Sequence, residues 1–280
     1  MLSLNVLSQV LAVNLSGSTG NLLPSPSLNS WGIAVALNTI LAIVAWIAPK
    51  KLLTPAGLFH GWFLGVLIWG CLGWQGYAVV MVYFLVGSAV TRIGMAEKEA
   101  AGIAEKRSGA RGPENVWGSA LTAAICAVGV GLLPWLNLGT ASDTVADWLF
   151  LGYVASFSTK LADTCASEIG KAYGQRTFLI TTLQAVPRGT EGAVSLEGTL
   201  AGVVASIAIA VLGWAVGLIS PLGIGFCMVA AFVATNLESV IGATLQTKLD
   251  WLSNELVNVV NTLIGAIVAI GLAIAVSAFS

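Results

Sequence analysis

The segment STKLADTCASEIGK, residues 158–171, places four charged side chains directly after an apolar run, in a chain where only 9% of the residues are charged. On a helix, Lys160, Asp163 and Ser167 lie on one face, because they are three and four residues apart. Glu168 lies on a neighbouring face. Carboxylates and cations so placed can bind Mg²⁺ and phosphate groups, which is what phosphoryl or nucleotidyl transfer requires.

Asp163 and Glu168 cannot share one metal ion on a regular helix, which leaves two arrangements open. Either the helix unwinds near Cys165, or Glu238 supplies the second carboxylate from another helix. A third interpretation assigns no chemistry: the helix emerges into water, and Lys160 and Asp163 form a surface ion pair. Small residues in the segment favour close packing over solvation. They are Ala162, Thr164, Ala166, Ser167 and Gly170.

A second polar segment, residues 97–120, brings cations to the start of an expected helix. Lys98, Lys106 and Arg111 precede the sequence GPENVWGSA, where Asn115 falls in the first helical turn. Cations beside a glycine-rich turn that leads into a helix N-terminus are suited to binding phosphate. The alternative is an ordinary basic loop on the inner side of a membrane.

A third segment, VPRGTEGAVSLEGTLAG at 186–202, combines glycines and hydroxyl side chains around Arg188. Flexible backbone N–H groups together with hydroxyls suit a polyphosphate or its Mg²⁺. No GxxxxGK[ST] sequence occurs in the chain, so the segment is not a Walker A loop. The alternative is a loop that re-enters the membrane or caps the following helix. The candidate phosphate-binding residues here are Gly189, Thr190, Gly192, Ser195 and Thr199.

A fourth polar segment, TNLESVIGATLQ at 235–246, places Glu238 at the end of an apolar run. A carboxylate in such a place is costly unless it is paired, protonated or bound to a metal. Glu238 is therefore the third candidate metal ligand, with Asp163 and Glu168. Asparagines between residues 254 and 261 also share one helix face, for which interhelical hydrogen bonding is the simplest interpretation.

The elements that position these residues are membrane helices. Hydrophobic residues make up 57% of the chain, and the mean hydropathy is +0.90. Apolar runs of about 17 to 25 residues recur, which is the length that spans a bilayer as a helix. The sequence predicts an all-α, polytopic membrane protein with about eight transmembrane helices. The predicted spans are 31–48, 56–72, 75–93, 115–136, 146–165, 195–218, 221–241 and 255–279.

The cations sort to one side of these predicted helices. With the N-terminus outside, the inner segments hold all twelve Lys and Arg residues, and the outer connections hold none. Because positive charge is retained on the cytoplasmic side, the polar segments should face the cytosol or stroma, with both termini on the opposite side. This one-sided placement favours a membrane-embedded enzyme over a transporter, which needs ionisable groups near the midplane. The inner segments are 49–55, 92–114, 160–194 and 242–254.

The chain divides into an N-terminal interfacial or partly ordered segment, 1–30, and a single transmembrane catalytic domain, 31–280. The cysteines form no CxxC pair and His60 is the only histidine, so neither a zinc site nor a Ser-His-Asp set is indicated. Basic residues are not interleaved with aromatic ones, so we expect no nucleic-acid partner. The sequence does not set the oligomeric state, and a homo-oligomer is compatible with it.

Four motifs together resemble one integral-membrane family, from about residue 30 to the C-terminus. In chain order they are GSAVTRIGMAEKEAAGIAEKRSGARGPENVWGSA, KLADTCASEIG, VPRGTEGAVSLEGTLAG and ESVIGATLQ. The family includes phytyl-phosphate kinase of tocopherol and phylloquinone biosynthesis, and it is similar in style to dolichol kinases and CDP-diacylglycerol synthases. The resemblance implies a CTP-dependent kinase that converts phytyl phosphate into phytyl diphosphate with Mg²⁺. It also implies a plastid or photosynthetic-bacterial membrane.

The leading hypothesis is a polyprenyl-phosphate kinase whose partners are membrane lipid, a prenyl phosphate and a nucleotide. Asp163 and Glu168 would be catalytic metal-binding carboxylates, and Lys98 and Arg111 catalytic cations. The alternatives are a CTP-using cytidylyltransferase acting on a lipid phosphate, and a carrier for a phosphorylated or anionic solute. Further nucleotide-binding or phosphate-binding candidates, besides the glycine-rich loop, are Lys106, Asn115, Lys160, Ser167 and Arg188.

Overall fold

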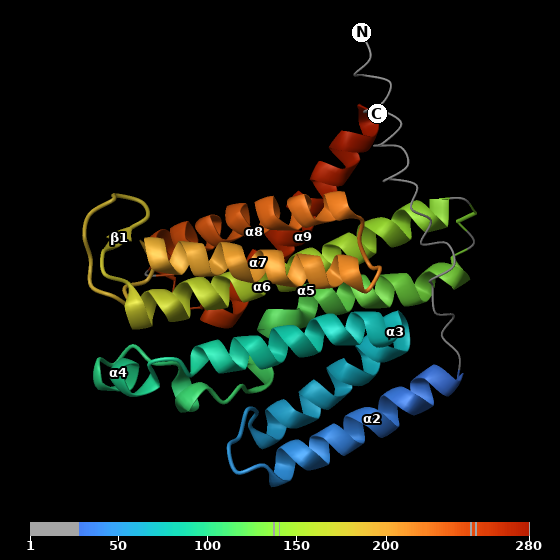
Figure 1. The fold of residues 1–280 in the computed structure, drawn as a ribbon, viewed down its shortest axis with the longest axis horizontal. Helices are drawn as coiled ribbons and strands as arrows, with labels where there is room; N and C mark the ends of the chain where they lie inside the picture. Colours follow the sequence, from blue (N-terminus) through green and yellow to red (C-terminus); the bar gives the residue numbers. More distant parts are fainter. Residues whose placement is uncertain (1–27, 137, 140, 247, 250, 280) are drawn as a thin grey trace.

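The computed structural model describes residues 28–279 except 137, 140, 247 and 250, so most of the predicted segment 1–30 lies outside the described residues. Long helices lie side by side in one bundle, and short elements gather at one end (Figure 1). The elements are α2 (Leu28–Ile47), α3 (Pro55–Thr91), α4 (Met95–Ala100), a 3-10 turn (Lys106–Gly109), α5 (Pro113–Leu132), a 3-10 turn (Leu133–Trp135), α6 (Ala141–Tyr173), β1 (Thr177–Leu179), β2 (Ala193–Ser195), α7 (Leu196–Ala215), α8 (Pro221–Ile241), a π turn (Gly242–Gln246) and α9 (Asn254–Ala278).

The predicted polytopic, all-α membrane fold is confirmed. Six of the described helices, α2, α3, α5, α7, α8 and α9, are long and apolar enough to cross a bilayer. α3 contains a break at Gly73, where φ is 65° and ψ is −162°. The chain turns back there, so the legs of α3 supply the two predicted spans 56–72 and 75–93 (Figure 1). With these legs counted separately, and with the more polar α6, each of the eight predicted spans has a helical counterpart.

Hydroxyl side chains fix where several helices begin. The Oγ atoms of Ser195, Ser220 and Ser253 accept hydrogen bonds from backbone N–H groups in the first turns of α7, α8 and α9. Thr54 does the same for α3. Such caps satisfy N–H groups that the helix itself leaves unpaired. The cap at Ser195 fixes the residue at which α7 begins after the glycine-rich loop.

Helix α6 lies at the centre of the bundle and contacts α3, α5, α7, α8 and α9. Its residues 150–165 are buried without interruption. Glycines let α7 approach it closely: a Cβ at Gly202 would lie 3.0 Å from the carbonyl oxygen of Ala162, and one at Gly213 would lie 2.7 Å from Cγ1 of Val154. Small residues are the usual means of close helix packing within a membrane. The position of α6 is therefore set by direct packing against neighbouring helices.

The outer surface of the bundle is apolar. Trp46 of α2, Val204 of α7 and Phe232 of α8 are 59%, 68% and 51% exposed. Apolar patches of this kind mark surfaces that another apolar phase covers. For helices of this length, that phase is the lipid bilayer.

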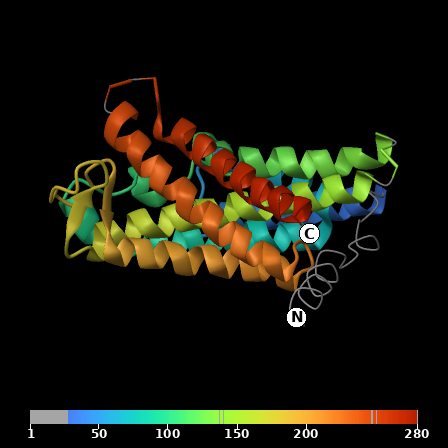
Figure 2. The same ribbon diagram turned by 90° about the horizontal axis from the view of Figure 1, so that it is seen from above.

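The connections that carry Lys or Arg lie at one end of the bundle. The connections α2–α3, α3–α5, α6–α7 and α8–α9 gather there, whereas α5–α6 and α7–α8 lie at the other end (Figures 1 and 2). The helical arrangement thus brings the four polar segments of the sequence to one face of the membrane domain.

Two features differ from the prediction. α6 extends beyond the predicted span 146–165 and continues through Cys165 to Tyr173, so the helix does not unwind there. The polar turns after Cys165 stay helical because they pack against α4, α7 and β2 instead of entering water. The following connection also contains an antiparallel pair, β1 and β2, with Thr177 opposite Ser195. An all-α description omits this short sheet.

Replacing Gly213 by Leu should destabilise the bundle, because the new side chain must displace Val154 or separate α7 from α6. Overpacking of this kind costs about 1–3 kcal/mol. Thermal unfolding of the purified protein in detergent, followed by circular dichroism, should show a lower midpoint. Gly225→Leu on α8 is the matched control, since a Cβ at Gly225 meets no atom within 4 Å. Equal destabilisation by both substitutions would contradict the close packing.

Candidate functional site

A polar cavity of about 210 Å³ opens at the cation-bearing end of the bundle. Helices α5 to α9 and the loops 105–111 and 189–195 form its walls. The four polar segments of the sequence therefore converge on one space. The predicted site residues that line it are Lys106, Arg111, Asn115, Lys160, Asp163, Ser167, Glu168, Gly189, Thr190, Gly192, Ser195, Thr199 and Glu238.

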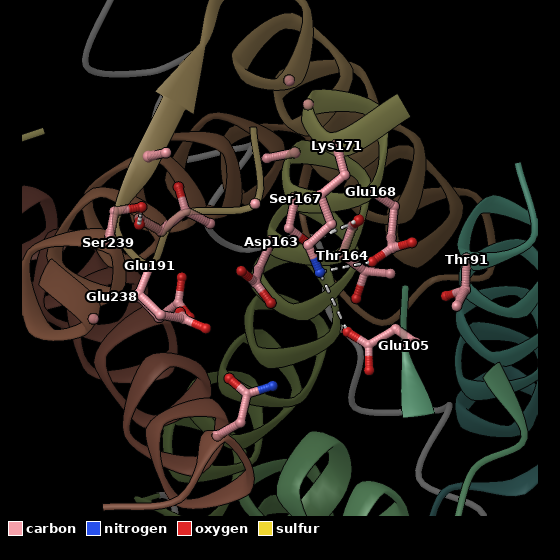
Figure 3. A pocket seen from close by; sticks show the side chains of 18 of the residues that line it. Thr91, Glu105, Asp163, Thr164, Ser167, Glu168, Lys171, Glu191, Glu238 and Ser239 are labelled. Carbon is pink, nitrogen blue, oxygen red and sulfur yellow. Dashed lines mark hydrogen bonds and ion pairs between the residues drawn. The ribbon is translucent and has the colours of Figure 1, made fainter. Parts of the chain in front are cut away.

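Asp163 projects from α6 into this cavity (Figure 3). One helical turn earlier, Lys160 Nζ donates a hydrogen bond to the Asp163 carboxylate. The same ammonium donates to Oδ1 of Asn258 on α9, 2.8 Å away. Lys160 and Asp163 are only 7% and 8% exposed, so this pair is held where water screens it little. Asn258 fixes the lysine, and the lysine orients the aspartate.

Glu238 of α8 approaches Asp163 from across the cavity. The carboxyl groups of Glu238 and Asp163 face the same cavity, and Lys160 lies beside Asp163 (Figure 3). Glu191 lies on the same side of the cavity (Figure 3). Neighbouring carboxylates repel one another unless a proton or a cation lies between them. This side of the cavity is therefore suited to a divalent cation.

The glycine-rich loop before α7 brings Glu191 to that position. Gly189 and Gly192 have φ values of 83° and 76°, which glycine adopts without a steric penalty. A Cβ at Gly192 would lie 2.6 Å from the carbonyl oxygen of Ser239 on α8. Gly192 thus allows the loop to lie directly against α8, beside Glu238.

Glu168 belongs to a separate charged cluster. Its carboxylate accepts hydrogen bonds from Lys98 Nζ and from Lys171 Nζ, the latter at 3.3 Å. Lys171 also lies 3.6 Å from Oε1 of Glu105. Lys98 and Glu168 are 1% and 2% exposed, and Lys98 donates to the carbonyl oxygen of Thr91 at 2.8 Å. This cluster ties α3, α4 and α6 together.

The structure does not bring the three predicted metal ligands together. Asp163 and Glu238 approach each other, whereas Glu168 is held by Lys98 and Lys171. Among the described residues, no group of three or more His, Cys, Asp or Glu side chains is arranged to hold a metal ion. Of the two arrangements that the sequence left open, the geometry matches the one in which Glu238 lies next to Asp163.

Arg111 forms another wall of the cavity and is rigidly held. Its Nη1 donates to the hydroxyl of Tyr83 at 2.7 Å, and its guanidinium carbon lies 5.4 Å from the centre of that ring. Its backbone pairs with residues 52 and 54. Asn115, also predicted to bind phosphate, has a structural role as well, because its Oδ1 accepts hydrogen bonds from Gly112 N–H and Arg107 Nη2, both at 2.9 Å.

Two predicted site residues do not line the cavity. Lys98 is buried in the cluster with Glu168, and the exposed Arg188 donates to the carbonyl oxygen of Ala172 at 3.0 Å. Several residues that line the cavity were not among the predicted site residues. These residues lie within the polar segments, which was the only sign in the sequence that they could belong to the site. Their spacing alone did not show which side chains face the cavity. They include Glu105, Lys171, Glu191, Thr235, Ser239 and Asn258.

The oxygen donors of the cavity fit Mg²⁺. Proteins usually hold Mg²⁺ through one or two carboxylates, with water and substrate phosphates completing the octahedral shell. Asp163 and Glu238 provide two carboxylates that face one cavity from different helices. The cavity beside them leaves room for phosphates and water.

Comparisons with known proteins support the resemblance found in the motifs. The family described as "Integral membrane protein DUF92" matches residues 38–266. This range includes all four motifs, and the match confirms the resemblance. The chain is 68% identical over 244 residues to "Uncharacterized membrane protein sll0875" of Synechocystis sp., covering 86% of this chain and 91% of that protein. It is 43% identical over 244 residues to "Protein VTE6, chloroplastic" of Arabidopsis thaliana, covering 86% and 71% respectively. No solved structure matches the chain.

Removing either member of the Lys98–Glu168 pair should destabilise the protein. Glu168→Leu leaves the buried Lys98 without a charged partner, which costs about 3–5 kcal/mol, and should lower the thermal unfolding midpoint in detergent. Lys98→Met should lower the midpoint less, because Lys171 still donates a hydrogen bond to Glu168. The double variant should lose less stability than the sum of the two single variants, because the Lys98–Glu168 interaction is then removed once.

The exposed pair of Arg107 and Glu114 provides the control for this cycle, since its side chains are 44% and 43% exposed. The corresponding substitutions there should change stability by about 1 kcal/mol or less. Losses at Lys98 and Glu168 that simply add in the double variant would show that the two residues are not coupled.

Proposed function

We propose that this chain, which belongs to the integral membrane protein family DUF92, is a kinase that transfers a phosphoryl group from CTP to phytyl monophosphate or another polyprenyl monophosphate. The observation that carries the proposal is the pair of Asp163 and Glu238 in a cavity that also contains cations and a glycine-rich loop. The motif resemblance to the family of phytyl-phosphate kinase supports the substrate class and the nucleotide.

The charges around the cavity explain why a metal ion would be needed. Carboxyl groups outnumber cations among the residues that line it, five to four, so a nucleotide triphosphate would meet no net positive charge. A divalent ion between Asp163 and Glu238 would reverse this local balance. When bound there, Mg²⁺ would neutralise phosphate oxygens and polarise the reacting phosphoryl group. The carboxyl residues are Glu105, Asp163, Glu168, Glu191 and Glu238, and the cations are Lys106, Arg111, Lys160 and Lys171.

The residues of the chain itself would bind and orient the phosphates. Lys160 is positioned by Asn258, and Arg111 by Tyr83, so both cations are fixed before substrate arrives. The loop 189–195 leads into the N-terminus of α7, where the helix dipole favours negative charge. Rigid donors of this kind lower the barrier because they need little reorganisation during the reaction.

The transfer requires no nucleophilic side chain. An oxygen of the lipid phosphate attacks the γ-phosphorus of CTP, and a new P–O bond forms. The bond between the γ-phosphorus and the β–γ bridging oxygen breaks, and CDP leaves with that electron pair. Because the second ionisation of a phosphate monoester has a pKa of about 6, the attacking oxygen is already deprotonated at neutral pH. The protein therefore contributes positioning and charge neutralisation.

The proposed location is a photosynthetic-bacterial or plastid membrane, with the site facing the cytosol or stroma. The connections that carry cations gather at the cavity end, and positive charge is retained on that side of a membrane (Figure 1). Both chain termini would lie on the opposite side. The similarity to proteins of Synechocystis and of the Arabidopsis chloroplast supports this location.

Asp163→Asn should reduce turnover by at least about a hundredfold while the protein stays folded, since the amide keeps an oxygen for Lys160 but loses the charge that binds metal. The assay is the formation of phytyl diphosphate from phytyl monophosphate, CTP and Mg²⁺ by purified protein in detergent. Asp143→Asn, in the first turn of α6 at the other end of the bundle, is the matched control and should retain full activity. Full activity of Asp163→Asn would contradict the assignment.

The nucleotide product distinguishes this kinase from its alternatives. Release of CDP in equal amount to the lipid diphosphate is expected. Release of pyrophosphate would instead indicate a cytidylyltransferase. Flux of an anionic solute across sealed vesicles without nucleotide consumption would indicate a carrier.

A further inference from the structure

A smaller crevice, of about 50 Å³, lies between α7 and α8 directly beside the polar cavity. Residues of α6 form its floor. The crevice adjoins the cavity, because the same five residues line both spaces. These are Ala166, Val194, Thr199, Thr235 and Ser239.

The crevice changes from polar to apolar along its length. Thr199 and Ser239 line it next to the cavity, whereas Val203 of α7 and Met228 and Phe232 of α8 line it farther away. Met228 precedes Ser239 by eleven residues, which corresponds to about 16 Å of helix. The crevice therefore leads from the polar end of the bundle toward the apolar middle of the membrane.

The outer edge of the crevice faces lipid, and its inner surface is made of small residues. Met228 and Phe232 are 37% and 51% exposed. Gly202 and Ala231 line the crevice and project no more than a methyl group into it. A hydrocarbon chain could thus enter sideways from the bilayer without first passing through water.

We infer that this crevice binds the hydrocarbon chain of the lipid substrate next to its phosphate group, and that the chain enters between α7 and α8. The inference rests on the proposed kinase function and assigns the place of the lipid within it. The position of the crevice beside the cavity would put the phosphate near Asp163 and Glu238 while the chain extends past Val203 and Phe232 into the bilayer. The crevice is too small for a whole long prenyl chain, so the remainder stays among lipid.

The crevice would orient the substrate more than it would increase affinity. A chain that leaves the bilayer for an apolar crevice gains little from the hydrophobic effect, because lipid is as apolar as the protein wall. The crevice would instead hold the lipid phosphate in a fixed orientation relative to the nucleotide. Reacting groups held in the right geometry react faster, so this orientation would increase the rate of phosphoryl transfer. A short-chain phosphate that reaches the cavity from water would not depend on the crevice.

The test compares phytyl monophosphate with dimethylallyl monophosphate as substrates for the purified protein in detergent. Ala231→Trp, which fills the crevice, should lower kcat/KM for phytyl monophosphate at least about tenfold, or about 1.4 kcal/mol. It should leave kcat/KM for dimethylallyl monophosphate within about twofold. Val229→Trp is the matched control, since Val229 is 44% exposed on the same helix and does not line the crevice; its two kcat/KM values should keep the ratio of the unmodified protein.

The outcomes separate this inference from the proposed function. If the unmodified protein phosphorylates neither substrate, the kinase proposal fails. If the protein is active and Ala231→Trp affects both substrates alike, or neither, the crevice assignment fails.

A second measurement needs no variant and no turnover. A phytyl monophosphate analogue with a diazirine on its first isoprene unit should label residues within 199–206 and 228–239 of the unmodified protein, and excess phytyl monophosphate should suppress this labelling. Competed labelling confined to α2, α5 or α9 would overturn the assignment.

Discussion

A charged side chain buried in a bundle surrounded by lipid must have a partner, and this constraint determines how the polar end of the protein is built. An isolated ion there would cost several kcal/mol. Lys98, Lys160, Asp163 and Glu168 are all at most 8% exposed, and each has an oppositely charged neighbour. The constraint extends beyond the pairs themselves. α6 remains helical to Tyr173 because its polar turns meet α4 and α7, and Asn258 of α9 is held by its bond to Lys160.

The two buried ion pairs have different surroundings and therefore different roles. Glu168 is engaged by Lys98 and Lys171, and this cluster fastens α4 to the bundle. Asp163 has one lysine and faces a cavity in which Glu238 and Glu191 also lie. The first arrangement is balanced within the protein, whereas the second has negative charge to spare. A cationic or metal-bound ligand would complete it, which is the electrostatic basis of the proposed nucleotide site.

The features that could be predicted from the sequence are those that depend on the local pattern of apolar and polar residues. Hydropathy predicted eight spans, each of which has a helical counterpart, and the four polar segments proved to meet in one place. The sequence could not predict which carboxylates lie together, because that depends on α8 lying against α6. A helical wheel of α6 places Asp163 and Glu168 on different faces, but it does not show which residues of neighbouring helices pack against each face. Long-range pairing also decides that Arg188 turns to the Ala172 carbonyl and that Lys98 is buried. The crevice between α7 and α8 likewise follows from the juxtaposition of two helices.

The central claim is that the cavity transfers a phosphoryl group between a nucleotide and a membrane lipid phosphate. The most direct measurement incubates the purified protein in detergent with phytyl monophosphate, Mg²⁺ and, in turn, CTP, ATP, GTP and UTP, and quantifies phytyl diphosphate. The account predicts phytyl diphosphate with CTP, together with an equal amount of CDP, and loss of both products when EDTA removes the metal. A folded protein that forms no phytyl diphosphate with any of these nucleotides would contradict it.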